Sequence, residues 1–367
     1  MYRSTAVALA LCLATITTQA ASVIRSVGGD STAASITPAR VLFRTDLGGG
    51  TTAGAGGSFG GLRREINWDG VPAPASAPNN LAANFFNVNS PRGVVFSTPG
   101  SGFQVSGASA DGGAGQPAAA AFGNVNPTYA SAFGVFSAQR LFTAVSSNVT
   151  DVTFFQPGTT KAATVSGFGA VFTDVNTLGS TTLELFSELN AALGTFNVPT
   201  GTVASASLSF LGVSFNGGEK IGRVRITSGN AVLGAGVNDG GATDLVVMDD
   251  FIYSEPVALP DADGDGAPDS ADNCNLLANP TQLDANRDGY GNDCDADLNN
   301  SFLVTTADFA ILRSVLNQSA ASSATAADAD LNGSGTVTTA DFAILRARLN
   351  TAPGPSGYAC AGTIPCP

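Results

Sequence analysis

Hydrophobic positions between residues 22 and 256 fall in short runs that are separated by Gly, Asn, Asp and Pro. These runs are rich in Val, Phe and Thr, which suit the pleated, half-buried surface of a strand. Polar and apolar side chains alternate over residues 182–186, and a second run at 193–198 follows a polar turn, so the pair predicts a β-hairpin. No long helical period is visible in this region. The pattern predicts a mainly β fold in which residues 22–256 form a large β-sandwich of jelly-roll type.

After residue 295 the pattern changes to an internal duplication. The ten residues Val-Thr-Thr-Ala-Asp-Phe-Ala-Ile-Leu-Arg occupy 304–313 and recur at 337–346, an offset of 33. Ten identical residues at one fixed offset indicate a true repeat. In the later copy, Phe342, Leu345 and Leu349 share one face of a predicted helix. The sequence therefore predicts a small α module made of two loop-helix repeats.

Acidic residues alternate with other residues in the segment that joins these two regions. Calcium takes about six to eight oxygen ligands, and an alternating acidic loop that turns at glycine can wrap it. A solvated acidic linker is the alternative, but random acidic runs do not alternate and turn at Gly in this way. The candidate ligands are Asp261, Asp263, Asp265, Asp269, Asp272, Asp284, Asn286, Asp288 and Asp293.

The same segment contains Cys274, the run Asn279-Pro280-Thr281-Gln282, and Cys294. Together with the alternating acids, these residues make residues 261–295 resemble a pair of thrombospondin type 3 repeats. The resemblance implies a segment with little hydrophobic core that folds around calcium ions. It also implies a disulfide between Cys274 and Cys294.

Each copy of the duplication contains a loop with oxygen-bearing residues at the spacing of calcium ligands. The later loop turns at Gly335 and offers Asp330, Asn332, Ser334, the backbone carbonyl of Thr336, Thr338 and Asp341. The earlier loop offers Asp297, Asn299, Ser301, Thr305 and Asp308, but Phe302 replaces the turn glycine. A bulky residue is disfavoured where a loop needs positive φ, so we expect weaker calcium binding there. A loop that packs without metal is the alternative for this copy.

Asp rather than Glu at the last ligand position, with one helix after each loop, makes residues 295–350 resemble a dockerin domain. The resemblance implies calcium as a folding cofactor and a cohesin-like domain as the partner. It places the partner contacts at the last two loop positions before the final ligand, and on the helix five residues beyond it. These contacts are Thr306, Ala307, Arg313, Thr339, Ala340 and Arg346. Because the two sets are nearly identical, either copy could present to the partner.

Composition narrows the classes of function. The 367 residues carry a formal net charge of −13, which disfavours nucleic acid and anionic membrane surfaces as partners. The sequence contains no His. This excludes His-based acid–base catalysis, Ser–His and Cys–His nucleophile pairs, and most zinc sites with nitrogen ligands.

The N-terminus predicts export. Residues 1–21 combine one positive residue, a short apolar run and small residues near Ala20, as in a secretory signal peptide. The apolar run is too short to span a bilayer, and no later stretch looks transmembrane. Cys12 leaves with this segment, and the even number of remaining cysteines suggests disulfides in a secreted or cell-surface protein. Cys360 and Cys366 suit a small terminal disulfide loop, with a reactive thiol pair as the alternative. The expected domains after the signal peptide are 22–256, 257–295, 296–350 and a Gly/Pro-rich tail at 351–367.

The predicted sandwich gives weaker functional signals. Trp68 is the only Trp, and it lies in the run 63–70 with two Arg and two carboxylates. A sugar-stacking role is the functional alternative, but a sole Trp in a sandwich is usually packed, so we expect a core position. Asp249 and Asp250 form an acidic pair in the predicted last strand. Such a pair recurs in jelly-roll carbohydrate-binding modules, where it can help hold a structural calcium, and the resemblance extends only to the fold.

Glycosidase chemistry needs two carboxylates on either side of a bond, and no spacing here marks such a pair. The candidates by residue type are Glu65, Asp69, Glu184, Glu188 and Glu219. We therefore expect a non-catalytic protein whose sandwich binds a glycan or a protein and whose C-terminal modules fold with calcium and dock to a cohesin-like partner. One alternative is an extracellular polysaccharide-degrading glycoside hydrolase, or an accessory component of one. Another is a structural adhesin stalk whose repeats pack within the chain.

Overall fold

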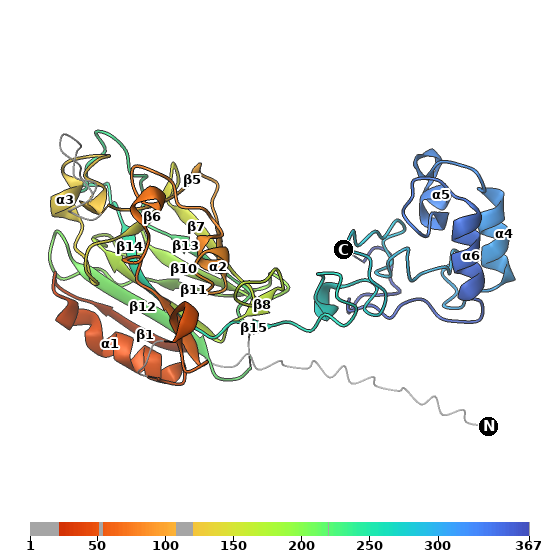
Figure 1. The fold of residues 1–367 in the computed structure, drawn as a ribbon, viewed down its shortest axis with the longest axis horizontal. Coiled ribbons are helices and arrows are strands. Elements are labelled where there is room, and N and C mark those ends of the chain that lie inside the picture. Colours follow the sequence, from red (N-terminus) through yellow and green to blue (C-terminus); the bar gives the residue numbers. More distant parts are fainter. Residues whose placement is uncertain (1–21, 51–53, 108–119, 219, 367) are drawn as a thin grey trace, which may run out of the picture.

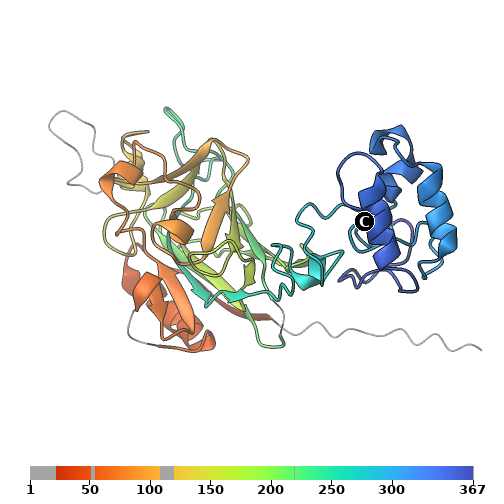
Figure 2. The ribbon, with the colours of Figure 1, turned by 45° about the vertical axis from the view of Figure 1, so that its right-hand side comes forward.

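A computed structural model describes residues 22–50, 54–107, 120–218 and 220–366. The predicted signal peptide at 1–21 lies outside these residues. Figure 1 shows a β-rich N-terminal part and a loop-rich C-terminal part that carries α4 (Thr306–Ser314), α5 (Ala324–Ala329) and α6 (Thr339–Ala347). Figure 2 shows the same division from another side. The prediction of a mainly β fold with a small helical C-terminal module is confirmed.

Two antiparallel sheets form the β-sandwich. The larger sheet runs in the order β1 (Ser22–Gly28), β12 (Leu208–Phe215), β9 (Gly167–Thr173), β14 (Val247–Ser254), β3 (Arg63–Ile66), β2 (Ser58–Phe59), with β6 (Phe142–Val145) pairing both β14 and β5 (Gly102–Val105). The smaller sheet runs in the order β11 (Ala192–Asn197), β10 (Thr182–Phe186), β13 (Arg223–Thr227), β7 (Val149–Phe154), β4 (Val94–Ser97). The antiparallel pairing of β10 with β11 confirms the predicted hairpin.

Smaller elements complete the N-terminal part. A short ribbon pairs β8 (Ala163–Thr164) with β15 (Val257–Ala258), so the strand pairing of the sandwich reaches Ala258. Single helical turns lie at α2 (Phe85–Val88) and α3 (Tyr129–Ala132). Short 3₁₀ turns occur in this part at Ala55–Gly57, Ala73–Ala75 and Ala120–Phe122. Two more lie in the C-terminal part, at Asp269–Ala271 and Ala320–Ser322.

Trp68 lies in the core between the two sheets. Its side chain is fully buried, its ring stacks on Phe142 with the centroids 4.1 Å apart, and its indole N–H donates to the Asp249 carbonyl oxygen at 2.7 Å. Phe86 and Phe251 meet the same ring edge-on. The expected core position is confirmed, and the sugar-stacking alternative is wrong because no face of the indole reaches solvent.

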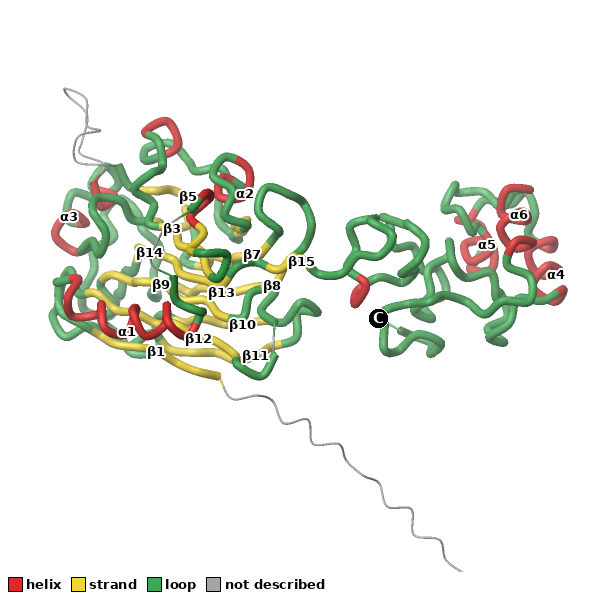
Figure 3. The backbone as a smooth tube through the Cα atoms, turned by 60° about the horizontal axis from the view of Figure 1, so that its bottom comes forward, coloured by secondary structure: helices red, strands yellow, loops and turns green. Residues whose placement is uncertain are grey.

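The sequence pattern missed a helix, because α1 (Ala33–Asp46) covers 14 residues of the region expected to lack long helices. Pro38 lies inside this helix, and Arg40 occupies its buried face between Ile36 and Phe43. The proline and the buried charge therefore obscured the helical face, whose buried positions are spaced by four and then three residues. Figure 3 shows α1 alongside β1 and β12.

Glycine allows α1 to approach the larger sheet closely. The Phe43 ring lies over Gly169 and Gly212, where an added Cβ would come within 2.8 and 2.7 Å of the ring. Around it, Phe43, Val171, Leu208 and Phe210 form an apolar cluster separate from the core between the sheets. The helix thus covers part of the outer face of this sheet and brings Arg40 to Asp250 on β14 and Arg44 to Glu65 on β3.

The C-terminal helical module is symmetric about its duplication. Val304 exchanges backbone hydrogen bonds with the 350–351 segment, and Val337 does the same with the 317–318 segment, which is its equivalent at the offset of 33. Phe309 and Phe342 meet with ring centroids 4.9 Å apart. The prediction for Leu349 is wrong: α6 ends at Ala347, and Leu349 lies beyond it and is exposed.

The acidic segment and the tail pack on each other. Cys274 and Cys294 form a disulfide, as do Cys360 and Cys366, so both disulfide predictions are confirmed. Backbone N–H groups of the tail donate to carbonyl oxygens of the acidic segment: Gly357 to Asp272, Gly362 to Asp288 and Cys366 to Arg287, at 2.6–2.7 Å. Within the described ranges, no helix has the length and apolar character needed to cross a bilayer.

Candidate metal centre and docking surface

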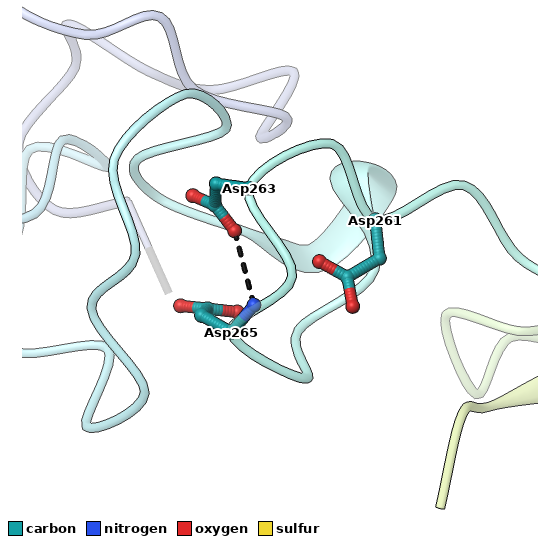
Figure 4. A group of neighbouring side chains, drawn as sticks. All are labelled: Asp261, Asp263 and Asp265. Carbon is teal, nitrogen blue, oxygen red and sulfur yellow. Dashed lines mark hydrogen bonds between the residues drawn. The ribbon is translucent and has the colours of Figure 1, made fainter. Parts of the chain in front are cut away.

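The first acidic loop brings Asp261, Asp263 and Asp265 together. One carboxylate oxygen from each lies within 4.8 Å of the others, and all three residues are half-buried (Figure 4). The loop is shaped by its own side chains, because Asp261 accepts from the Gly264 N–H at 2.8 Å and Asp263 from the Asp265 N–H at 3.2 Å. Gly264 and Gly266 adopt φ of 80° and 100°, which only glycine adopts freely.

Buried oxygen atoms in this loop lack partners. Oδ2 of Asp263 and Oδ2 of Asp272 are buried without a hydrogen bond. Burial, then the neighbouring Asp263 and Asp265 carboxylates, raise the pKa of Asp272. An uncompensated buried carboxylate is costly, and calcium is the ion that an all-oxygen set of this kind suits. The residues therefore fit a calcium ion. Asp269 is tied to the start of the same loop, because it accepts a hydrogen bond from the Ala262 N–H.

The second half of the acidic segment repeats this geometry. Asp284 accepts from the N–H groups of Arg287 and Gly289 at 2.7 and 2.9 Å. Asn286 accepts from the Asp288 N–H at 3.0 Å, and Asp288 accepts from the Tyr290 N–H at 2.9 Å. Asp293 is half-buried next to Arg348, and burial raises its pKa.

Two acids near this segment were not among the predicted ligands. Burial and the nearby carboxylates raise the pKa of Asp295 to about 8 and that of Asp328 to about 7. The charges of Asp288 and Asp297 act on both. Asp328 lies in an Ala-rich stretch directly before the later loop, and it is the equivalent of Asp295 at the offset of 33. Applying the 33-residue offset to Asp295, which precedes the earlier loop, would have identified Asp328.

The two loops of the duplicated module share one geometry. Asp308 and Asp341 are fully buried, and each accepts from the threonine N–H that precedes its helix at 2.7 Å. They also accept from the N–H groups of Asn299 and Asn332, at 3.1 and 3.2 Å. Thr305 and Thr338 complete a capping box with these acids, which fixes the first turns of α4 and α6.

The first acids of the two loops are also matched. Asp297 and Asp330 are each 2% exposed, and they accept from the Ser301 and Ser334 N–H groups at 3.1 and 3.0 Å. The serine hydroxyls donate to the carbonyl oxygens of Leu303 and Thr336. In each loop, hydrogen bonds therefore connect the first acid to the serine, and the last acid to the asparagine and the threonine.

Phe302 adopts the conformation that the expected turn glycine would take. Its φ is 63°, and that of Gly335 in the later loop is 88°. A left-handed residue with a Cβ costs roughly 1–2 kcal/mol. The Phe302 ring is exposed on one side and lies against Gly362 of the tail on the other. The earlier loop thus keeps its shape under strain, with the tail packed against the strained residue.

Replacing Phe302 by glycine is expected to raise the calcium affinity of the earlier loop by roughly fivefold, because about 1 kcal/mol of backbone strain is removed. Isothermal titration calorimetry of calcium binding would measure it. The reciprocal control is Gly335→Phe, which should weaken the later loop by a similar factor. Unchanged or weaker binding in Phe302→Gly would contradict this account of the strain.

The implied partner contacts are all exposed. They are distributed equally over the starts and outer faces of α4 and α6: Thr306, Ala307, Arg313, Thr339, Ala340 and Arg346. Each helix presents threonine and alanine in its first turn and arginine as its next-to-last residue. The module therefore has two equivalent surfaces.

Two acidic residues of the larger sheet, Glu65 on β3 and Asp250 on β14, are paired with arginines of α1. Both oxygens of Glu65 accept from Arg44 at 2.7 Å, and Arg63 lies 3.2 Å from one of them. Arg40 donates to Asp250 at 2.5 Å. A recess of about 370 Å³ is lined by the ion-paired side chains of α1, Glu65 and Asp250, together with Asn67, Phe136 and Ser137.

The other carboxylates named as catalytic candidates lie apart or are held by backbone. Burial raises the pKa of Asp69, which accepts from the Arg140 N–H at 3.2 Å. Glu184 is on β10 in the smaller sheet, Glu188 follows that strand, and Glu219 lies outside the described residues. Asp249 is fully buried and accepts from the Phe136 N–H and the Ser137 hydroxyl.

Comparison with known families and structures agrees with the C-terminal part. Residues 295–350 match the Dockerin type I domain, which confirms that resemblance. A search among curated proteins finds no match.

Solved structures similar to the chain include a family 6 carbohydrate-binding module, at 13% identity over 44% of this chain and 86% of that one, with a TM-score of 0.22. A family 29 carbohydrate-binding module from Piromyces equi has 14% identity over 34% and 75%, with a TM-score of 0.19. A glycoside hydrolase family 43 arabinoxylan arabinofuranohydrolase from Bacillus subtilis has 14% identity over 45% and 27%, with a TM-score of 0.22. At these TM-scores the likenesses carry no argument about what the sandwich does.

Proposed function

We propose that this is an exported calcium-binding protein that docks, through residues 295–350, to a cohesin-type domain of a partner. The observation that carries the proposal is the Dockerin type I match over two loops whose acids make the same hydrogen bonds in both copies. The two disulfides support export, because such bonds persist in oxidising compartments. The net charge of −13 fits a protein or glycan partner better than a nucleic acid.

Calcium is the proposed folding cofactor of the whole region from Asp261 to Asp341. Residues 261–295 are proposed to act as a thrombospondin type 3-like repeat pair, supported by the converging acids and the Cys274–Cys294 disulfide. In the duplicated module, the acids from Asp297 to Asp308 and from Asp330 to Asp341 would hold one ion each. Bound calcium would neutralise carboxylates that otherwise repel one another, and so make the folded loops stable.

The sandwich is proposed to be a non-catalytic binding module for a glycan or another protein. Support comes from Glu65 and Asp250, whose ion pairs with Arg44 and Arg40 give these carboxylates a structural role. A polysaccharide-hydrolysing activity remains the second hypothesis from the sequence. A screen of the full chain on soluble polysaccharides separates the two: product release that a single Glu or Asp substitution abolishes would replace the binding hypothesis.

Docking is expected to survive either single charge reversal but not both. Arg313→Glu should leave binding through the α6 surface, and Arg346→Glu should leave binding through α4. The double variant should bind cohesin domains at least about tenfold more weakly, because both equivalent surfaces are then altered. Surface plasmon resonance against cohesins from the same source would measure it, in calcium and in chelator.

The matched control is Arg287→Glu, a charge reversal in the acidic segment outside the two helices. It should leave docking unchanged. Full binding by the double variant would reject the proposed surface. Equal binding in chelator and in calcium would reject the calcium dependence.

A further inference from the structure

Three aspartates lie around the turn at Asn176 and Thr177 in the sandwich, outside the C-terminal acidic repeats. Asp174 directly follows β9, Asp239 lies in the loop after β13, and Asp244 precedes β14. Asp174 and Asp244 are fully buried, and Asp239 is half-buried. Within the described residues, no ion pair joins any of the three to Lys or Arg.

Asp244 is satisfied by the neighbouring turn. One of its oxygens accepts from the Asn176 N–H at 3.0 Å, and the other from the Thr177 N–H at 3.1 Å and from the Ser180 hydroxyl. These bonds hold the turn that follows Asp174 in place. The charge of Asp244 therefore has a structural role and also contributes negative potential to the site.

Asp174 is not satisfied. Both of its carboxylate oxygens are buried without a hydrogen bond of acceptable geometry. Burial raises the pKa of Asp174 to about 7, and the negative charges of Asp239 and Asp244 act in the same direction. The Asn176 amide lies close enough to lower that pKa in part. Asp239 accepts from the Leu245 N–H and the Asn176 amide, at 2.9 and 3.2 Å. A fully buried carboxylate near two others, with neither oxygen bonded, requires either a proton or a cation to offset its desolvation.

We propose that Asp174 and Asp239 bind a calcium ion beside the turn at Asn176, a site separate from the C-terminal loops. Asp174 would supply two unpartnered oxygens from inside and Asp239 a carboxylate from the half-buried side. Water reaching the exposed side of Asn176 would supply further ligands. The all-oxygen set and the lack of His favour calcium over zinc or copper. A proton shared between Asp174 and Asp239 would satisfy one of the two orphaned oxygens and leave the other, whereas one ion serves both.

Such an ion would fasten the segment after β9 to the long loop between β13 and β14. These segments come from distant parts of the sequence, 65 residues apart between Asp174 and Asp239. No local spacing could identify the site, and it becomes visible only in the fold.

Trp68 allows a test on the full chain. It is the only Trp and is buried in the sandwich core, so thermal unfolding followed by its fluorescence reports the sandwich and not the C-terminal loops. With calcium at roughly a hundred times its dissociation constant, the Tm of the chelator-treated protein should rise by about 5–10 °C. Magnesium at the same concentration should have a much smaller effect, because it is reluctant to dehydrate.

The rise in Tm should disappear in Asp174→Asn and in Asp239→Asn. If Asp174→Asn fails to fold, Asp239→Asn still tests the calcium site, because Asp239 is only half-buried. The control Asp261→Asn/Asp263→Asn, which disables the first C-terminal loop, should keep the full rise. An unchanged Trp68 transition on adding calcium to the wild type, or a full rise in the Asp239 variant, would overturn the proposal.

Discussion

Replacing Arg40 by methionine is expected to destabilise the β-sandwich by about 3–5 kcal/mol, because the change leaves a buried carboxylate without its counter-ion. Arg40 is 3% exposed and donates to Asp250 at 2.5 Å, while its guanidinium lies 4.0 Å from the Phe136 ring centroid. In this variant Glu65 still pairs with Arg44 and Arg63. Among the residues that the structure describes, Asp250 forms no ion pair other than the one with Arg40. Urea unfolding followed by Trp68 fluorescence would measure the loss.

The loss should be smaller at low pH. Burial raises the pKa of Asp250 and Arg40 lowers it, so removing Arg40 raises that pKa further. A carboxyl group whose folded-state pKa exceeds its unfolded-state pKa stabilises the protein when protonated and loses that contribution as pH rises. The destabilisation should therefore be smaller at pH 5 than at pH 8.

The control is Arg25→Met, which removes the half-exposed ion pair between β1 and α1. It should cost far less than the Arg40 change, because an ion pair at the surface contributes little to stability. If the Arg40 and Arg25 variants were equally stable, the buried pair would not hold α1 to the sheet as described.

Removing the Cys274–Cys294 disulfide is the second change with a large expected effect. Both residues are almost completely buried, and the disulfide closes a loop of 20 residues in a segment with little regular structure. The double variant Cys274→Ala/Cys294→Ala should lose about 3 kcal/mol, from the entropy regained by the unfolded chain. Hydrogen exchange in saturating calcium should show protection in residues 272–294 reduced roughly a hundredfold.

Cys360→Ala/Cys366→Ala provides the comparison. Its loop spans six residues, so the loss should be smaller, about 2 kcal/mol. It should appear in the tail and in the residues that the tail contacts, such as Asp288 and Arg287. A larger effect from the short loop than from the long one would show that tail packing, not loop closure, stabilises the acidic segment.

The sequence predicted most where spacing carries the information. Alternation over 182–186 predicted the hairpin, and the exact duplication predicted the loop-helix repeats. Phe302 was recognised as a misfit from its position alone, and its positive φ agrees with the reason given. These features are local, so neighbouring residues were sufficient to identify them.

The sequence predicted least where distant residues complete a feature. Arg40 disguised α1 because its partner Asp250 is 210 residues away, and a charge on an apolar face makes sense only beside that partner. The tail was expected to be a Gly/Pro-rich end with its own disulfide loop, yet its N–H groups also bond the acidic segment. Asp174 and Asp239 have no spacing that connects them. Such contacts depend on tertiary structure and leave no periodic pattern.

Hydrogen exchange measured by mass spectrometry, in calcium and in chelator, tests most directly whether calcium folds the C-terminal region. In calcium, amides of 297–308 and 330–341, together with α4 and α6, should be protected, because N–H groups of these loops bond the acids that we propose as calcium ligands. In chelator, that protection should be lost while strands β9, β12 and β14 of the sandwich stay protected. Equal protection of α4 and α6 in both conditions would show that the module folds without calcium and would contradict the proposed function.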